Sequence, residues 1–260
     1  MRTLNIAAGV AILLATVAAD ARIRTEAREY KDGNTVLEGV LAYDDAQSGR
    51  RPGIVVVHDW SGLGPDVKGR IEMLAKLGYV AFAADIYGKG VVPKNAGESA
   101  KLAGEFKADR PMLRRRAQAA LDVLLADPHV DPKRVAAMGY CFGGGTALEL
   151  ARSGAPLRAV VSFHGFLDTP DPADAKAIRA KVLVLHGADD PFVPPAQVAA
   201  FEDEMRKAAV DWQLVKYGGA VHAFTIQGAG SDPSKGVAYN PEADRRSWEE
   251  MKTFLAATLK

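Results

Sequence analysis

The segment Gly139-Tyr140-Cys141-Phe142-Gly143 decides how this chain is interpreted, and Gly144 and Gly145 follow it directly. It lies between a short apolar stretch, predicted as a strand over 135–139, and a predicted helix over 143–152. Small residues two positions before and after the centre are typical of a nucleophile elbow, a strained strand-to-helix turn crowded by neighbouring backbone. Here a cysteine takes the central position that serine usually holds.

Such a turn would equip Cys141 for nucleophilic attack. The helix that begins after it points its N-terminal amides at the sulfur, which favours thiolate over thiol. The N–H of Phe142 can then donate to the oxyanion of a tetrahedral intermediate. The alternative interpretation is a buried structural cysteine, which is common in protein cores. Two further residues, which follow in the right order, favour the catalytic interpretation.

An acid and a histidine come after the cysteine, each at the end of a later predicted strand. Asp189 and Asp190 are adjacent, and Asp190 is preferred because it directly precedes a proline that turns the chain. His222 follows the next predicted strand in a loop that contains two glycines. Cys141, Asp190 and His222 therefore stand in the nucleophile–acid–histidine order of α/β-hydrolases.

The other four histidines lack this downstream position. His58 and His186 end predicted strands, and His129 lies in a loop. His164 follows a predicted strand and can line the cleft, but a hydrogen-bonded loop histidine is the favoured interpretation.

Strand and helix patterns alternate along the chain, with no internal repeat and no linker between domains. Gly53–His58 is a continuous β-branched run, as expected of a strand buried on both faces. The alternation predicts one α/β domain, with a mostly parallel sheet and helices on both faces. Further strands are expected over 25–30 and 35–43 (a hairpin with its turn at 32–34), 79–84, 157–163, 181–186 and 212–217, and helices over 67–77, 96–126 (two, broken at Pro111), 195–209 and 241–259.

Residues 1–21 are predicted to be a secretory signal peptide. Arg2 precedes an apolar run over 6–17, and Ala19-Asp20-Ala21 fits a cleavage site. This run is shorter than the about 20 residues that a transmembrane helix needs. A buried first helix or a short anchor is the alternative. Cleavage would leave a hydrolase domain over 22–260 that is exported to the periplasm, or secreted, without stable membrane insertion.

Composition narrows the classes of function. Lys and Arg total 33 and Asp and Glu total 32, giving a net charge of +1, so nucleic acid is not an expected partner. The one basic run, 114–116, is interpreted as a solvated helix face. The single cysteine excludes an intrachain disulfide and a zinc site built from several cysteines. No metal or organic cofactor is implied.

Several segments together resemble the dienelactone hydrolases (carboxymethylenebutenolidases), a family with the α/β-hydrolase fold. The resemblance runs from about Thr35 to the C-terminus. It implies an esterase or lactonase acting on a small molecule, in which Cys141 is the nucleophile, His222 the base and Asp190 its orienting acid. The matching segments are His58–Leu63, Ala84–Gly88, Gly139–Gly144, Asp190–Pro194, His222–Thr225 and Ala238–Asn240.

The resemblance also assigns the groups around the sulfur. The backbone N–H groups of Phe142 and Trp60 would form the oxyanion hole. Asp59 matches a glutamate that in the family holds the resting thiol and takes its proton when substrate binds. Aspartate is one methylene shorter than that glutamate.

The substrate-binding positions depart from the family. Two arginines there hold the substrate carboxylate, whereas Lys89 and Ile226 stand at the matching positions of this chain. Tyr87, within a matching segment, is also expected at the substrate. A neutral substrate, or an anion held less well than dienelactone, is therefore expected. A broad carboxylesterase or thioesterase with the same triad, and a non-catalytic ligand-binding or redox-sensing protein that uses Cys141, are the alternatives.

Overall fold

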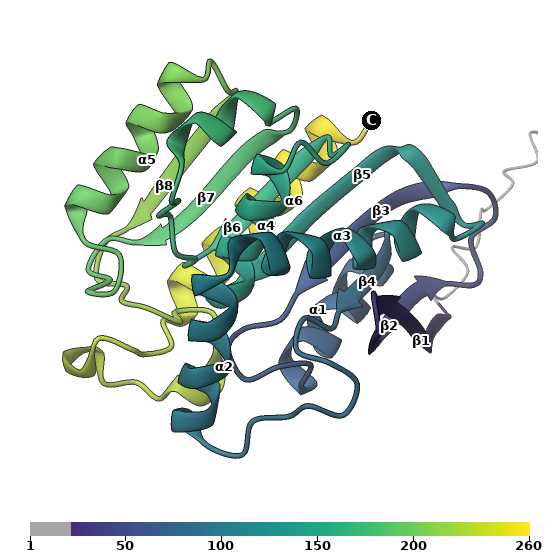
Figure 1. The fold of residues 1–260 in the computed structure, drawn as a ribbon, viewed down its shortest axis with the longest axis horizontal. Coiled ribbons are helices and arrows are strands. Elements are labelled where there is room, and N and C mark those ends of the chain that lie inside the picture. The colour runs from purple at the N-terminus through teal and green to yellow at the C-terminus, as the bar shows by residue number, and fades with distance from the viewer. Residues whose placement is uncertain (1–21) are drawn as a thin grey trace, which may run out of the picture.

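An eight-stranded, mostly parallel sheet runs through the computed structural model, which describes residues 22–260 (Figure 1). The strand order is β1-β2-β4-β3-β5-β6-β7-β8, and only the β1–β2 and β2–β4 pairings are antiparallel. The predicted fold class is therefore confirmed. The strands are β1 (Ile23–Asp32), β2 (Thr35–Asp44), β3 (Arg51–Val57), β4 (Val80–Ala84), β5 (Val130–Tyr140), β6 (Ala159–Phe163), β7 (Lys181–Gly187) and β8 (Trp212–Tyr217).

Helices cover both faces of this sheet. Buried residues of α1 and α6 pack on one face, and those of α2, α3, α4 and α5 pack on the other. The α-helices are α1 (Pro65–Lys76), α2 (Ala96–Ala108), α3 (Arg110–Ala126), α4 (Phe142–Arg152), α5 (Pro195–Lys207) and α6 (Pro241–Thr258), and short 3₁₀ helices span Pro172–Ala177, Gln227–Ala229 and Pro233–Lys235.

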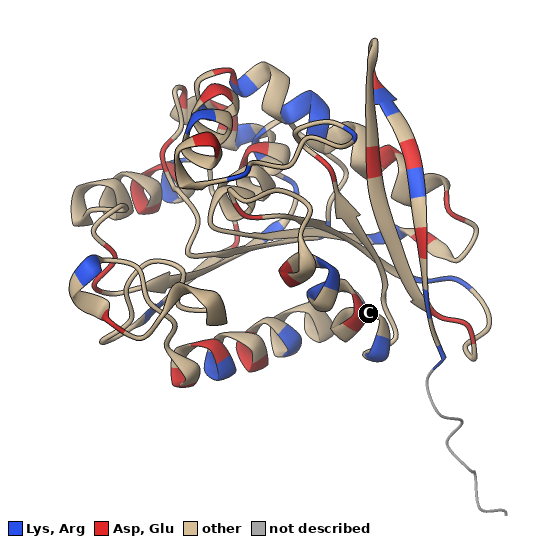
Figure 2. Ribbon diagram, turned by 90° about the horizontal axis from the view of Figure 1, so that it is seen from below, with Lys and Arg blue, Asp and Glu red and all other residues tan. Residues whose placement is uncertain are grey.

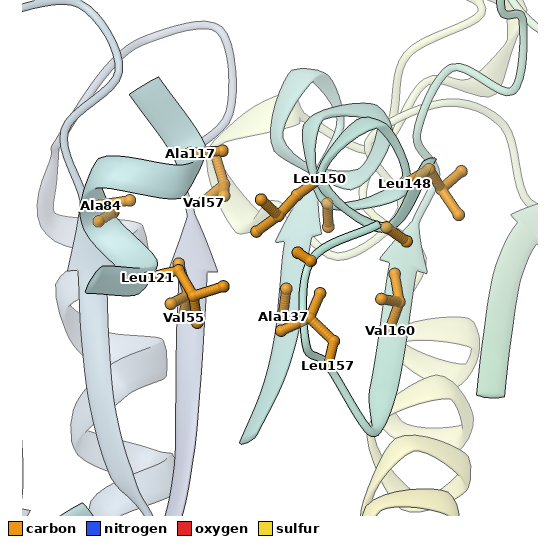
Figure 3. Close-up of a cluster of buried hydrophobic side chains, with 14 of the residues drawn as sticks. Val55, Val57, Ala84, Ala117, Leu121, Ala137, Leu148, Leu150, Leu157 and Val160 are labelled. Carbon is orange, nitrogen blue, oxygen red and sulfur yellow. The ribbon is translucent and has the colours of Figure 1, made fainter. Parts of the chain in front are cut away.

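The central strand β3 shows why a continuous β-branched run suits this position. Val55 and Val57 point toward α3, as Figure 3 shows, whereas Ile54 and Val56 belong to the core on the opposite face. All four side chains are fully buried. Burying one such side chain contributes about 1.5–3 kcal/mol, so the strand is stabilised from both sides.

Charged side chains lie on the helices and on the β1–β2 hairpin. Figure 2 shows acidic and basic residues interspersed along the hairpin, while the centre of the sheet carries few of either. This pattern suits β1, because charges along an edge strand oppose pairing with a second sheet.

The boundary between the two central helices differs from the prediction. The chain breaks at Asp109, and Pro111 lies in the first turn of α3. A proline is tolerated there because the first N–H groups of a helix have no intrahelical acceptor. The Asp109 carboxylate instead accepts a hydrogen bond from the N–H of Met112, at 2.9 Å, and caps the new helix.

The predicted signal peptide, residues 1–21, lies outside the residues that the structure describes. Within 22–260, no helix combines the length and the apolar character needed to cross a bilayer.

Candidate active site

Cys141 occupies a strained turn between β5 and α4. Its backbone angles are φ 53° and ψ −116°, a conformation that is uncommon for a residue with a side chain. A Cβ atom on Gly139 would lie 2.2 Å from the carbonyl oxygen of Gly143, and one on Gly143 would lie 2.2 Å from that of Val57. The two glycines are therefore required by the close approach of three backbone segments.

The structure brings the three predicted triad residues together at the carboxyl edge of the sheet. His222 Nε2 lies 3.1 Å from Cys141 Sγ, and His222 Nδ1 lies 2.8 Å from Asp190 Oδ2. The other carboxylate oxygen of Asp190 accepts a hydrogen bond from the N–H of Phe192, at 2.8 Å. The carboxylate is thus held on both sides, and the imidazole spans the distance from it to the sulfur.

The neighbouring Asp189 has a different position. Its side chain is exposed, and its carboxylate accepts a hydrogen bond from the N–H of Gly219, at 2.9 Å. Asp189 therefore supports the loop that leads to His222 and does not contact the imidazole.

Two opposing influences act on His222. Burial disfavours its charged form, but the adjacent Cys141 sulfur and the Asp190 carboxylate outweigh this effect and raise its pKa to about 10. The imidazole therefore holds a proton at neutral pH, and its Nε2 lies 3.1 Å from the sulfur.

A cavity of about 610 Å³ opens over the sulfur. This volume falls in the range of pockets for small organic ligands. Trp60 and Phe192 are exposed at 41% and 59% on its rim, and Phe192 packs edge-on against His222 with ring centres 5.3 Å apart. None of the described residues that line it is a lysine or arginine. They are Asp59, Trp60, Ser61, Asp66, Cys141, Phe192, His222, Ala223, Ile226, Gly228, Ala229 and Val237.

The proposed oxyanion donors lie beside this cavity. Phe142 is the first residue of α4, so its N–H has no intrahelical acceptor. Trp60 follows β3, and its carbonyl oxygen accepts a hydrogen bond from the Tyr87 hydroxyl, at 3.0 Å. Tyr87 is buried and is not among the lining residues. Its hydroxyl group holds the loop that contains Trp60, whereas a contact between Tyr87 and the substrate was expected from the sequence.

Asp59 lines the cavity but is engaged elsewhere. Its Oδ1 accepts hydrogen bonds from both the N–H, at 2.7 Å, and the hydroxyl of Ser61. The sulfur of Cys141 faces His222 instead. The thiol-holding arrangement expected for Asp59 is therefore absent from this conformation of the described residues.

The two positions expected to bind a carboxylate have different surroundings. Ile226 lines the cavity and offers an apolar wall. Lys89 is not among the lining residues, because its ammonium pairs with Glu29 at 2.6 Å and Glu38 at 3.0 Å on the hairpin. Its position therefore gives no support to a substrate-binding role.

His164, which the sequence places either at the cleft or, in the favoured interpretation, in a hydrogen-bonded loop, is buried next to the triad and is not among the residues that line the cavity. His164 accepts a hydrogen bond from the N–H of Cys141 through Nδ1, at 3.1 Å, and its Nε2 lies 2.8 Å from the Thr225 hydroxyl. Burial, reinforced by the nearby His222, holds its pKa well below the usual value, so His164 stays neutral. In the sequence, the position of His164 directly after a predicted strand was the feature that placed it near the carboxyl edge of the sheet and so near the site.

Across residues 22–260, no cluster of three or more His, Cys, Asp or Glu side chains is arranged to hold a metal ion.

The chain is similar to known proteins in sequence. The sequence model of the dienelactone hydrolase family matches residues 37–259. A putative carboxymethylenebutenolidase from Synechocystis sp. is 26% identical over 254 residues, covering 92% of this chain and 98% of the relative. A probable 2-oxo-3-(5-oxofuran-2-ylidene)propanoate lactonase from Bradyrhizobium sp. is 29% identical over 243 residues, covering 89% and 94%.

A solved structure extends the likeness to three dimensions. The crystal structure of a dienelactone hydrolase-like promiscuous phosphotriesterase from metagenomic libraries is 44% identical, with a TM-score of 0.88. The match covers 92% of this chain and 99% of that one. With an α/β-hydrolase sheet, an elbow cysteine and a family match over most of its length, the chain belongs to the dienelactone hydrolase family, a family of hydrolases.

Proposed function

We propose that the protein hydrolyses neutral esters or lactones through a thioester formed on Cys141. The observation that carries this proposal is the approach of His222 Nε2 to within 3.1 Å of the sulfur, beneath a cavity lined by no lysine or arginine among the described residues. The family supplies the general reaction, and this geometry supports the nucleophile and the base.

The reaction proceeds in two halves. The Cys141 sulfur attacks the carbonyl carbon, and the N–H groups of Phe142 and Trp60 stabilise the oxyanion that forms. The C–O bond of the ester then breaks, and protonated His222 gives its proton to the leaving alkoxide. Water next attacks the thioester while His222 takes a proton from it, which releases the carboxylic acid and restores the sulfur. Asp190 orients the imidazole throughout.

The cavity favours an uncharged acyl or alcohol group. Ile226 adds an apolar wall, against which each buried methylene of a substrate contributes about 0.8 kcal/mol. Burial of a carboxylate without a cationic partner would be unfavourable. The Arg70 guanidinium lines a neighbouring smaller cavity and already pairs with Asp244 at 2.9 Å.

A second substrate class is a neutral phosphotriester. A relative that is 44% identical carries phosphotriesterase in its name. A phosphotriester has no net charge, so the apolar lining suits it for the same reason as a neutral ester. The same sulfur would attack phosphorus, the P–O bond to the leaving group would break as His222 protonates the alkoxide, and water would then cleave the S–P bond and release the dialkyl phosphate.

The test is a substrate panel with the purified mature protein. It contains p-nitrophenyl butyrate, a neutral γ-lactone, dienelactone and a dialkyl p-nitrophenyl phosphate, each also assayed with Cys141→Ala. We expect the neutral ester or lactone to have the highest kcat/KM and mass spectrometry to detect an acyl group on Cys141. Full activity in Cys141→Ala would refute the mechanism. No turnover of any substrate, together with a stable sulfenate on Cys141, would favour a redox sensor.

We also propose that Asp59 restrains ionisation of the thiol in resting enzyme. Its carboxylate lines the cavity beside Cys141, and a nearby negative charge opposes formation of a second one. Asp59→Asn should therefore speed alkylation of Cys141 by iodoacetamide below neutral pH. An unchanged or slower rate would argue against this role.

For the N-terminal segment, we propose export and removal of residues 1–21. The apolar run ending in Ala19-Asp20-Ala21 supports this proposal. N-terminal sequencing of the native protein should begin at Arg22, and an intact Met1 on soluble cytoplasmic protein would refute it.

A further inference from the structure

His164 lies directly beneath the nucleophile, at the end of β6. Its side chain is fully buried, with ring centres 5.4 Å from His222 and 5.0 Å from Phe224. The ring therefore lies between the elbow that carries the sulfur and the loop that carries the base, and it is neither exposed to solvent nor itself part of the cavity wall.

The hydrogen bonds of this ring determine its tautomer. The N–H of Cys141 points at both the carbonyl oxygen of Phe163, at 3.0 Å, and Nδ1 of His164, at 3.1 Å. Nδ1 must therefore be unprotonated, so Nε2 carries the hydrogen and donates it to the Thr225 hydroxyl, at 2.8 Å. One neutral imidazole thus joins the nucleophile's own backbone to the His222 loop.

Thr225 is anchored in turn by a different part of the fold. Its carbonyl oxygen accepts a hydrogen bond from Arg70 of α1, at 3.0 Å, and Arg70 also pairs with Asp244 of α6. Arg70 further packs over the rings of Tyr140 and Trp248. The contact between His164 and Thr225 therefore connects the elbow to two helices on one face of the sheet.

The strained backbone conformation of His164 indicates that its surroundings hold this residue in place. Its φ is 39°, next to the Cys141 φ of 53° on the neighbouring strand end. Backbone in this region is strained for residues with a side chain and persists only where the surroundings hold it. The N–H of His164 donates to the carbonyl oxygen of Leu185, at 2.8 Å, which holds the turn on its other side.

We propose that His164 is a positioning residue, whose two ring nitrogens hold the Cys141 amide and the Thr225 hydroxyl and so maintain the contact between nucleophile and base. A displacement of about 1 Å in such a contact can reduce the rate by about a hundredfold. The inference rests on the proposed nucleophilic role of Cys141.

Two pairs of variants distinguish the contribution of the bond from the Cys141 N–H to His164 from that of the bond between His164 and Thr225. Thr225→Val removes the acceptor for Nε2 with little change in shape, and Thr225→Ser retains it. His164→Asn retains an acceptor near the Nδ1 position and tolerates positive φ, whereas His164→Gln loses that acceptor. His129→Asn is the control, because that histidine is partly exposed and bonds to Asp127 away from the site.

Each variant is assayed for kcat and KM with p-nitrophenyl butyrate, for melting temperature, and for the rate of iodoacetamide alkylation at neutral pH. Alkylation reports on Cys141 alone, because the chain has a single cysteine. It needs no substrate, so it tests the positioning role even if the panel above shows no turnover.

We expect His164→Gln to lower kcat by about ten- to a hundredfold with KM changed less than about threefold. His164→Asn should lose less, and Thr225→Val should lose more than Thr225→Ser. Alkylation should slow in the same order, because an imidazole that is no longer held in place stabilises less thiolate. A purely structural role would lower the melting temperature and leave kcat and alkylation unchanged.

Unchanged kcat and alkylation in both His164→Gln and Thr225→Val would overturn the inference. The proposed function fails by a different result, which is full hydrolysis by Cys141→Ala. Should His164→Gln not fold, the comparison of Thr225→Val with Thr225→Ser still decides between the two outcomes.

Discussion

The two sides of Cys141 are built differently. On the buried side, Gly139 and Gly143 flank the nucleophile where backbone segments approach too closely for a Cβ atom, and the Cys141 N–H bonds to the Phe163 carbonyl oxygen and to His164. On the open side, the cavity is bounded by side chains such as Trp60, Phe192 and Ile226. Trp60 and Phe192 are largely exposed on the rim.

This difference suggests that the buried side governs the rate of the reaction and that the open side governs which substrate is accepted. A Cβ added at Gly143 would collide with backbone that cannot move away, so the buried side tolerates almost no variation. A changed side chain on the open side meets the empty cavity and alters what fits there. We therefore expect substitutions on the buried side to lower kcat and those on the open side to change substrate preference.

The largest expected effect comes from removing the reacting pair itself. Cys141→Ala should lower kcat by at least about a thousandfold, because the Ser61 hydroxyl, which also lines the cavity, is hydrogen-bonded to Asp59 and not to His222. Adding His222→Ala should hardly deepen the loss, since residues that act as one unit are not additive. Single-turnover and steady-state assays with p-nitrophenyl butyrate measure both values. Additive losses would mean that the two residues act separately.

Asp189 and Asp190 are neighbours in the chain, but only Asp190 contacts His222, so substituting each in turn tests which residue orients the base. Asp190→Asn should reduce kcat by about a hundred- to ten-thousandfold, because the amide no longer favours the required imidazole tautomer. Asp189→Asn is the matched control. Its amide oxygen can still accept from Gly219, so kcat should stay within about threefold. Greater damage from Asp189→Asn would reverse the assignment of the orienting acid.

Local patterns were sufficient to predict most of the buried side. The continuous run in β3 predicted a central strand, and the Gly-x-Cys-x-Gly spacing predicted the turn that the structure contains. Both signals arise from backbone crowding and burial, which act on residues close together in sequence. The order Cys141, Asp190, His222 then predicted which strand ends would meet.

Other features depended on contacts that no local pattern encodes. Lys89 pairs with Glu29, which lies 60 residues away, and His164 meets Thr225 at a separation of 61. Whether a lysine faces a cleft or a hairpin depends on such distant partners. The same holds for Tyr87, whose hydroxyl reaches the Trp60 carbonyl instead of the cavity.

On the open side, a single cation should change substrate preference. Ile226→Arg should raise kcat/KM for dienelactone by about ten- to a hundredfold, because a hydrogen bond to a charged group is worth about 1.5–3 kcal/mol. It should also lower kcat/KM for neutral, apolar esters, because the apolar wall is lost. Competition assays with the two substrates measure the ratio directly.

A matched, uncharged variant tests whether the change in substrate preference comes from the charge of the arginine. Ile226→Met has a similar volume and no charge, so it should leave the preference for neutral over anionic substrate within about threefold. If unmodified protein already hydrolyses dienelactone far faster than any neutral ester, another group must hold the carboxylate. The contrast between the two sides of Cys141 would then need revision.

The smallest effect is expected at Lys89, which belongs to neither side. Its ammonium is held by Glu29 and Glu38 on the hairpin, and these two carboxylates raise its pKa, so it stays charged but already paired. An exposed ion pair of this kind contributes little to stability and offers no free charge to a substrate. Lys89→Met should therefore leave kcat/KM within about twofold for neutral esters and dienelactone alike.

Glu38→Gln is the matched variant, because it removes one of the two carboxylates that pair with Lys89, and it should leave kcat/KM unchanged in the same way. A loss of about tenfold confined to dienelactone would show that Lys89 leaves the hairpin and reaches the cavity during turnover, and it would extend the open side to include this residue.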